Sequence, residues 1–391
     1  MHNPFKDYTL ELTAHQRSIT VTEDEPDVIG HDYYSQLDGI RFISIMGVLF
    51  QHFLNPRLSH FLMTGNAGVD LFFVISGFLI TENLIKLKAN HSVQKGLKVF
   101  YVRRVLRIFP LYYLYWAILL VFFLPLVADH KWYGIFYLIN FYDIYHSLPN
   151  LTGHLWSLSV EEQFYVVWPV LIFLAPRKYI LTMTFVSVLL ACLFMLLNYQ
   201  HPNQDYNYFH TLSCAVALLT GGVIACLKQF DYKRLLNWIA VSRILSPFAL
   251  LLFTGISVLY RLGKVQDSEL ILIRLFICVL GFYWIGKAAT QSFKGWFGLF
   301  LSNRWVRKIG QMAYGIYMFH YLVYNLVQPV LQNITDKIFQ PVIFEETPLK
   351  YLKYNVSIIH FPFLVAAVFA VAWVSYTFFE SRILKLKRYF T

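Results

Sequence analysis

The chain has 391 residues, of which 57% are hydrophobic and only 14% are charged. A typical soluble domain carries about 25% charged residues, so this composition excludes a soluble globule. The abundance of apolar residues also excludes a disordered chain. The four cysteines lie in apolar stretches without C-x-x-C spacing and are interpreted as small buried hydrophobes rather than a disulfide scaffold. The composition therefore predicts a polytopic membrane protein.

Ten apolar runs are long enough for membrane-spanning helices, each of which needs about 20 mostly apolar residues. In chain order they lie near 39–54, 68–86, 105–127, 155–175, 179–198, 208–227, 244–260, 269–289, 309–332 and 358–380. A shorter run, 132–142, sits in a polar, aromatic loop and is interpreted as re-entrant or interfacial. No run alternates as a barrel strand does. We therefore expect an all-α fold: a helical membrane bundle of about ten transmembrane helices.

Two segments are expected along the chain. Residues 1–36 form a polar, mostly acidic tail, and residues 37–391 form the membrane domain. The first apolar run begins only behind this tail, so no cleavable signal peptide is expected.

The net charge of +11 is distributed as a topology signal rather than as a nucleic-acid surface. If the N-terminus is cytoplasmic and ten helices alternate, most of the 33 Lys and Arg residues fall in inner loops and in the C-terminal tail. This asymmetry is what the positive-inside rule describes. We expect a multi-pass protein of the cytoplasmic membrane with both termini cytoplasmic, in contact with membrane lipids and with no nucleic-acid partner.

The first predicted helix carries two ionisable residues, and such groups inside a membrane are functional candidates because they are costly there. Arg41 and His52 are eleven residues apart, so they share a helical face about 16 Å apart along the axis. They could line a path through the bundle, or they could be a snorkelling arginine and an interfacial histidine. Asp70 enters the second helix at the depth of His52. It is expected either to form a general-base pair with that histidine or to charge its own helix N-terminus.

Three arginines, Arg103, Arg104 and Arg107, stand at the predicted cytoplasmic start of the third helix. Arg103 and Arg107 are four residues apart and share a face. Arginine clusters bind phosphates through bidentate, charge-assisted hydrogen bonds. An inside-positive signal in contact with lipid headgroups explains the same residues, so the spacing alone leaves both interpretations open.

A segment near residues 154–171 combines histidine, tryptophan and two adjacent glutamates. Ser159 and Glu162 match the S-x-x-E capping box and predict a helix start. Glu161 and Glu162, with His154 and Trp156, exceed what a cap needs and are expected at the outer membrane level. A glutamate there could bind a polar acceptor, and aromatic rings suit sugar faces.

His320 falls near the middle of a later aromatic helix, where a histidine is either a hydrogen-bonded packing residue or a substrate ligand. The sequence contains no Gly-rich phosphate loop, no H-E-x-x-H, no metal-spaced His/Cys cluster and no G-x-S-x-G elbow. No metal is therefore expected. Ser76 is a candidate nucleophile, although a packing serine is the preferred interpretation.

Six stretches together resemble acyltransferase family 3, a family of integral membrane enzymes that move acyl groups onto carbohydrates. They are LDGIRFISIMGVLFQHF, GVDLFFVISGFLI, RRVLRIFPLYYLYW, HLWSLSVEEQFYVVWPVL, AYGIYMFHYLV and SYTFFESRILKLKRYF. They occur in the family's order and cover roughly residues 36–388. The resemblance implies a ten-helix membrane acyltransferase domain.

The resemblance also implies the chemistry. The donor would be acyl-CoA from the cytoplasm, most simply acetyl-CoA, and the acceptor a hydroxyl of a cell-surface or exported glycan or glycolipid. The family's Arg-x10-His signature falls on Arg41 and His52, which would make His52 the general base, helped by Asp70, Glu161 or Glu162. The RR-x-x-R block places Arg103, Arg104 and Arg107 with Arg41 as cofactor-binding residues. Some members carry a C-terminal hydrolase-like domain, so this chain would work alone or with a separate extracytoplasmic partner.

His154, Trp156 and His320 complete the expected site as substrate-binding residues. Two other functions remain open at this stage. The first is a non-catalytic transporter or flippase of a saccharide, which ten helices and a polar stripe would also suit. The second is an O-succinyltransferase, whose acidic acyl group would need a cation of its own.

Overall fold

The computed structural model describes residues 33–54, 63–203, 205–265, 271–339 and 356–390. The chain divides into Met1–Tyr33 and Tyr34–Thr391, and the second unit is described below. The acidic tail expected over 1–36 lies almost wholly outside the described residues, so the proposed segment boundary stays a prediction.

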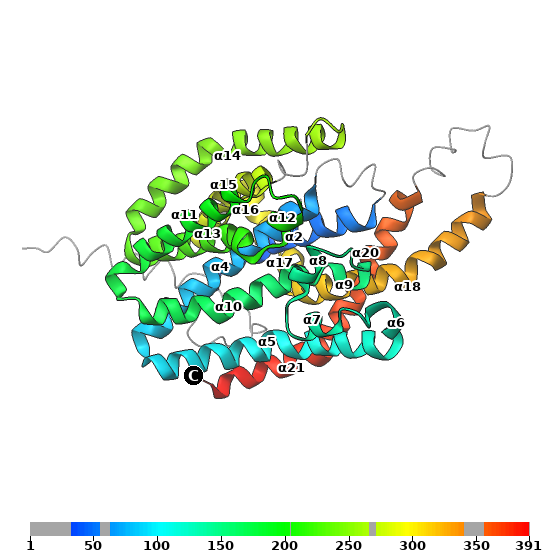
Figure 1. The fold of residues 1–391 in the computed structure, drawn as a ribbon, viewed down its shortest axis with the longest axis horizontal. Helices are drawn as coiled ribbons and strands as arrows, with labels where there is room; N and C mark the ends of the chain where they lie inside the picture. Colours follow the sequence, from blue (N-terminus) through cyan, green and yellow to red (C-terminus); the bar gives the residue numbers. More distant parts are fainter. Residues whose placement is uncertain (1–32, 55–62, 204, 266–270, 340–355, 391) are drawn as a thin grey trace, which may run out of the picture. The chain divides into compact units, whose positions relative to one another are not determined.

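The described residues form helices throughout (Figure 1), without a strand among them. The longer helices are α2 (Ser35–Phe53), α4 (Thr64–Asn90), α5 (Val93–Phe122), α10 (Trp156–Leu174), α11 (Ile180–Leu197), α13 (Thr211–Phe230), α14 (Tyr232–Arg261), α15 (Ile271–Ala289), α18 (Ala313–Phe339) and α20 (Val356–Ser375). The shorter ones are α6 (Leu124–Val127), α7 (Lys131–Ile135), α8 (Ile139–Asp143), α9 (Asn150–Gly153), η1 (Arg177–Tyr179), α12 (Asp205–Phe209), α16 (Gly295–Leu301), α17 (Arg304–Gln311), η4 (Tyr376–Glu380), α21 (Ser381–Leu384) and η5 (Lys385–Tyr389).

Each of the ten predicted apolar runs coincides with one of the longer helices. Within the described ranges, eight helices are long and apolar enough to cross a membrane. Helices α2 and α18 complete the set of long helices, and they carry His52 and His320 among their polar residues. The short run 132–142 forms the two small helices α7 and α8. The all-α membrane bundle expected from the sequence is thus confirmed.

Helix α4 lies at the centre of the packing and contacts α2, α13, α15, α10 and α5. Small residues permit its close approach to α13. A Cβ added at Gly77 would lie 1.7 Å from the Leu218 carbonyl oxygen, and one added at Gly221 would lie 2.0 Å from the Val74 carbonyl oxygen. Small residues at the interface are how membrane helices gain close van der Waals contact without a hydrophobic driving force.

Large apolar side chains cover the outer faces of α11 and α14. Leu189 and Leu197 on α11 are 67% and 77% exposed, and Leu251 on α14 is 69% exposed. In water this surface would be a severe liability. In lipid it costs nothing, because the surrounding hydrocarbon is as apolar as leucine.

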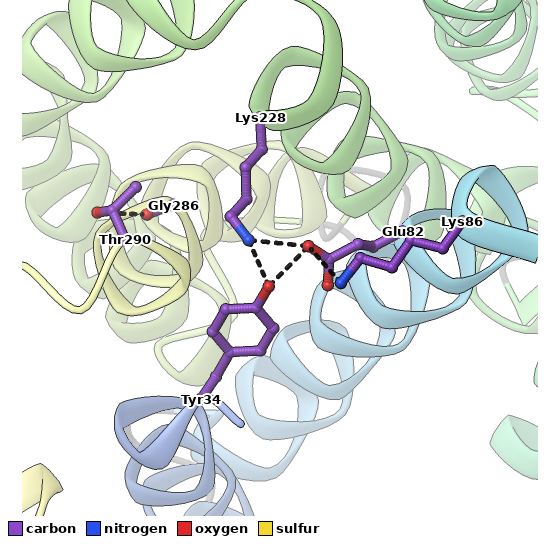
Figure 2. Close-up of polar contacts among 6 residues, drawn as sticks. All are labelled: Tyr34, Glu82, Lys86, Lys228, Gly286 and Thr290. Carbon is purple, nitrogen blue, oxygen red and sulfur yellow. Dashed lines mark hydrogen bonds and ion pairs between the residues drawn. The ribbon is translucent and has the colours of Figure 1, made fainter. Parts of the chain in front are cut away.

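Four polar residues join α2, α4 and α13 at one end of the bundle (Figure 2). The Tyr34 hydroxyl donates to Glu82 Oε1 at 2.6 Å, and the Lys228 ammonium lies 2.8 Å from the same oxygen. Lys86, one turn along α4, lies 3.7 Å from it. Lys228 also donates to the Tyr34 hydroxyl and sits 4.4 Å from the centre of its ring. The buried Glu82 carboxylate is therefore matched by two cations.

Lys88 fixes the end of α10 against α4. Its ammonium donates to the carbonyl oxygens of Ile172, Phe173 and Ala175 at 2.9, 2.8 and 2.6 Å. These groups belong to the last turn of a helix, where carbonyls lack intrahelical partners and the dipole favours a cation. The cap holds α10 in place, and α10 carries both glutamates of the candidate site.

Candidate active site

Two histidines from opposite ends of the sequence meet in the bundle. His52 lies in the last turn of α2, and its Nδ1 is 2.8 Å from Nε2 of His320 on α18. The two rings are parallel to within 10°. Tyr321 stacks on His52 with ring centres 4.6 Å apart, and His154 packs edge-on against His320 at 4.9 Å. The structure thus brings together His52, His154 and His320.

Backbone carbonyls orient two of these imidazoles. His320 Nδ1 donates to the Tyr317 carbonyl oxygen at 2.6 Å, and His154 Nε2 donates to the Met318 carbonyl oxygen at 3.2 Å. The Tyr317 hydroxyl donates to the His154 carbonyl oxygen at 2.9 Å. His154 and His320 are fully enclosed, whereas His52 is partly accessible. Of the three rings, His52 is the one that a substrate can reach.

Glu161 lies about two turns further along α10 than His154 and is held by hydroxyl groups. Ser76 of α4 donates to its Oε1 at 2.8 Å, and Tyr165 donates to its Oε2 at 2.9 Å. Tyr165 follows Glu161 by four residues, so both side chains share one face of α10. Ser76 is therefore a hydrogen-bond donor to a carboxylate in this structure.

Arg104 faces this carboxylate pair. Its guanidinium stacks over the rings of Phe100 and Tyr165, 5.6 and 5.7 Å from their centres, and the charges of Glu161 and Glu162 act on it. Glu162 Oε1 is buried and has no hydrogen-bond partner among the described residues. A buried carboxylate oxygen normally has one, so this oxygen can accept a donor from a bound ligand.

The three histidines, together with Glu161, Glu162 and Arg104, are called the polar column below. The other arginines lie near its Arg104 end. Arg41 forms an ion pair with Asp38, one turn before it on α2, and Gln311 of α17 donates to the other oxygen of Asp38 at 3.2 Å. Arg107 is exposed, and the positive charge of Arg41 acts on it. Arg103 is turned toward the C-terminal segment, where its Nε donates to the Phe390 carbonyl oxygen at 3.0 Å.

Positive charge exceeds negative charge at this end. Within the described part of the chain, no ion pair within 4.0 Å joins Arg104 or Arg107 to a carboxylate. The C-terminal turn η5 packs on α5. The positive charges of Arg103, Arg104 and Arg107 act on its residue Lys387. Figure 1 shows α21, which leads into this turn, running beside α5. The carboxylates of Glu161 and Glu162 act on Arg104, and those of Asp38 and Glu380 act on Arg107. A cluster of arginines that is not tied up in close ion pairs fits a phosphate-rich anion.

Asp70 is not paired with His52 in the structure. Its Oδ1 accepts a hydrogen bond from Arg274 Nε at 3.0 Å, and Arg274 also donates to the Asn207 and Tyr208 carbonyl oxygens at 3.2 and 3.0 Å. Asp70 and Arg274 are both buried. The hydrogen-bonded pair with His52, one of the two alternatives expected for Asp70, is not formed here, because a buried guanidinium from α15 competes better for a carboxylate than a neutral imidazole does.

One expectation about α10 also needs correction. The helix begins at Trp156, so Ser159 lies inside its first turn and donates to the Leu155 carbonyl oxygen rather than capping the helix with Glu162. Glu161 and Glu162 lie further along the chain than His154, near Arg104. Trp156 is buried among Phe73, Tyr208 and Phe209, so its role in substrate binding stays a prediction.

Other polar residues of the column were missed by the sequence reasoning. Tyr165 could have been found from its spacing of four from Glu161. Tyr317 and Lys387 carry no such signal, because their partners come from distant segments. Asp143 lies at the end of α8, and its charge acts on Tyr321. Tyr321 in turn stacks on His52. Burial and the charge of Asp205 raise the pKa of Asp143 to about 7.

The described residues form a helical, multi-span membrane bundle whose polar column is cationic at one end and histidine-lined at the other. The sequence comparisons then give the class of protein. Residues 34–377 match the acyltransferase domain family, and the chain belongs to that family. No solved structure matches the chain.

Curated relatives point in the same direction. The chain is 29% identical over 391 residues to the peptidoglycan O-acetyltransferase OatA of Listeria monocytogenes, a match covering 90% of this chain and 56% of the relative. It is 30% identical over 342 residues to YrhL of Bacillus subtilis, provisionally named a peptidoglycan O-acetyltransferase, covering 81% of this chain and 52% of the relative. The chain therefore spans somewhat more than half the length of these relatives.

Proposed function

We propose that this protein is an acyl-CoA-dependent O-acyltransferase that moves an acetyl group to a hydroxyl of a cell-wall glycan. The observation that carries the proposal is the internal column. Arg104 and the exposed Arg107 lie at its cationic end and form no ion pair within 4.0 Å among the residues that the structure describes, and the His52–His320 pair lies at the other end. Arg41 and His52 connect the two ends along α2, about 16 Å apart.

The charge distribution along the chain supports an orientation of the two ends in the membrane. By the positive-inside rule, the arginine cluster and both termini are cytoplasmic, which is where CoA is found. The residues present fit that donor: guanidinium groups bind its phosphates, and the buried Glu162 oxygen can accept an amide N–H of its pantetheine arm. The thioester would then be near His52, at the extracytoplasmic end.

His52 would act as the general base. It takes the proton of the acceptor hydroxyl as that oxygen bonds to the thioester carbonyl carbon. The carbon–sulfur bond then breaks, and the proton passes to the departing thiolate, which leaves as free CoA. Assistance of this kind typically contributes about 10²–10⁴-fold to the rate. The direct route requires no covalent enzyme intermediate.

The acceptor follows from the relatives and from the proposed orientation. Two relatives bear names that specify peptidoglycan, which lies outside the cytoplasmic membrane. A glycan hydroxyl would approach His52 from that side, past Tyr321 and Asp143. An aromatic ring and a carboxylate are the groups that sugars bind in proteins, through the ring face and through hydrogen bonds.

The test uses the full chain purified in lipid nanodiscs, with acetyl-CoA binding and release of free CoA as readouts. Wild type is compared with His52→Ala and with an Arg104→Ala/Arg107→Ala double variant. Arg382→Ala is the control, because this exposed arginine lies in the C-terminal segment outside the column. We expect the double variant to lose affinity, His52→Ala to bind without turnover, and the control to match wild type.

Two results would contradict the proposal. If folded wild type neither binds acetyl-CoA nor releases CoA with peptidoglycan fragments present, the arginines are topology signals, and transport becomes the better explanation. If succinyl-CoA is used in preference to acetyl-CoA, the reaction class stands and the acyl group is corrected.

A further inference from the structure

The contact between His52 and His320 continues through a second hydrogen bond to the backbone. His320 Nδ1 is 2.6 Å from the Tyr317 carbonyl oxygen, and His320 Nε2 is 2.8 Å from His52 Nδ1. The chain of contacts therefore runs from a fixed carbonyl through one imidazole to the next. His320 is completely buried, so water does not compete for either of its nitrogens.

This geometry determines where the protons are. A carbonyl oxygen can only accept, so His320 must carry its proton on Nδ1. A neutral imidazole has one N–H and one lone pair, which leaves His320 Nε2 as an acceptor. His52 must then donate from Nδ1, and its basic lone pair is on Nε2. The tautomer of a histidine is set by the hydrogen bond that its other nitrogen makes.

We propose that His320 is a positioning residue that holds His52 in the Nδ1–H tautomer, so that Nε2 is the atom that takes the proton of the acceptor. The role is the one that a carboxylate plays in a Ser-His-Asp triad, here filled by a neutral imidazole anchored to the Tyr317 carbonyl. The catalytic consequence rests on the proposed function. The tautomer of His52 does not depend on the proposed function, and it is measured independently of activity.

The surroundings favour a neutral relay. His154 packs edge-on against His320 and donates its own Nε2 proton to the Met318 carbonyl oxygen. Asp70, the carboxylate that the sequence offered as a partner for His52, is bound to Arg274. His52 and His154 both contact His320. A positive charge on any of these three imidazoles is therefore disfavoured before the reaction. The relay therefore orients His52 without protonating it.

The experiment is nitrogen NMR of the full chain in nanodiscs with ¹⁵N-labelled histidine, in which Nδ1–H and Nε2–H imidazoles have distinct shifts. The His52 signals are those lost in His52→Gln. Two replacements of similar size are compared at the relay position. His320→Gln keeps an oxygen that can accept the Nδ1 proton, whereas His320→Met fills the space without an acceptor.

We expect His52 to be the Nδ1–H tautomer in wild type and in His320→Gln, and to lose that preference in His320→Met. We also expect His320→Met to lower kcat about 10- to 100-fold, within the range of a general base, while KM for acetyl-CoA changes less than about threefold. His360→Gln is the control, because His360 is a buried histidine that bonds Thr335 and Gln328 far along α18.

An Nε2–H tautomer of His52 in wild type would overturn the proposal. So would an identical tautomer in the Gln and Met variants, or a loss of kcat in His360→Gln as large as that in His320→Met. If the tautomer responds as expected but no variant turns over acetyl-CoA, the relay stands and the proposed function fails.

Discussion

Asp70 and Arg274 form a buried ion pair across 204 residues of sequence, with Nε and Oδ1 3.0 Å apart. Arg274 also donates to two carbonyl oxygens of α12, so one guanidinium joins α4, α15 and α12. A charge inside a membrane bundle is tolerated when it is paired and hydrogen-bonded. This pair therefore joins three parts of the bundle through one buried guanidinium.

Asp70→Asn should be strongly destabilising, because it leaves the Arg274 guanidinium buried without a counter-charge. Breaking such a pair costs about 3–5 kcal/mol, which thermal unfolding in detergent would detect. Asp231→Asn is the matched control. Asp231 pairs with Arg234 at 3.2 Å, but both side chains are substantially exposed, and exposed pairs contribute about 0–1 kcal/mol. Equal losses in the two variants would show that burial of the Asp70 pair is unimportant.

Gly77→Val should disrupt the packing of α4 against α13. The added side chain would occupy the space of the Leu218 backbone, and the helices would have to separate. Overpacking a tight interface costs about 1–3 kcal/mol or more. Gly255→Ala on α14 is the comparison, because an added Cβ there meets nothing within 4 Å. That variant is expected to be neutral or slightly stabilising, since alanine favours a helix by about 1 kcal/mol. A stable Gly77→Val protein would refute the close approach.

The Glu82 cluster of Figure 2 should behave as a coupled unit. Lys228→Met leaves Glu82 with Lys86 alone, at 3.7 Å, and Glu82→Gln leaves two lysines close together. Either change should lower the unfolding temperature. The Glu82→Gln/Lys228→Met double variant should lose less than the sum of the two, because the cluster then has the same net charge as in wild type. Additive losses in this double-mutant cycle would mean that Glu82 and Lys228 do not interact.

Asp143 should make stability depend on pH near neutrality. Its folded-state pKa, raised to about 7 by burial and by Asp205, exceeds the ordinary aspartate value of 3.8. The folded state therefore holds a proton that the unfolded state has released between these two values, and stability falls as pH rises through this window. Asp143→Asn should flatten the fall in unfolding temperature between pH 5 and pH 8. An unchanged slope would show that another group is responsible.

The sequence was sufficient for the helices, because length and hydropathy are local properties. The ten apolar runs and the short run 132–142 appear as helices close to the expected positions. The link between Arg41 and His52 was also visible, since an eleven-residue spacing on one helix fixes their relative direction. The grouping of Arg103, Arg104 and Arg107 was visible in the same way, but their expected place at the start of the third helix was wrong, because α5 begins earlier, at Val93.

The partners of these residues were decided by tertiary structure alone. Asp70 and His52 were expected together because their helices are consecutive, yet α15 supplied Arg274 and α18 supplied His320. Hydropathy predicts that a helix crosses the membrane. It does not predict which helix lies beside it or how the helix is rotated about its axis. Hydrogen-bond partners depend on both, because they are satisfied only within about 3 Å. For this protein the sequence determined the membrane fold and the candidate residues, and the packing of distant helices determined which of them form the site.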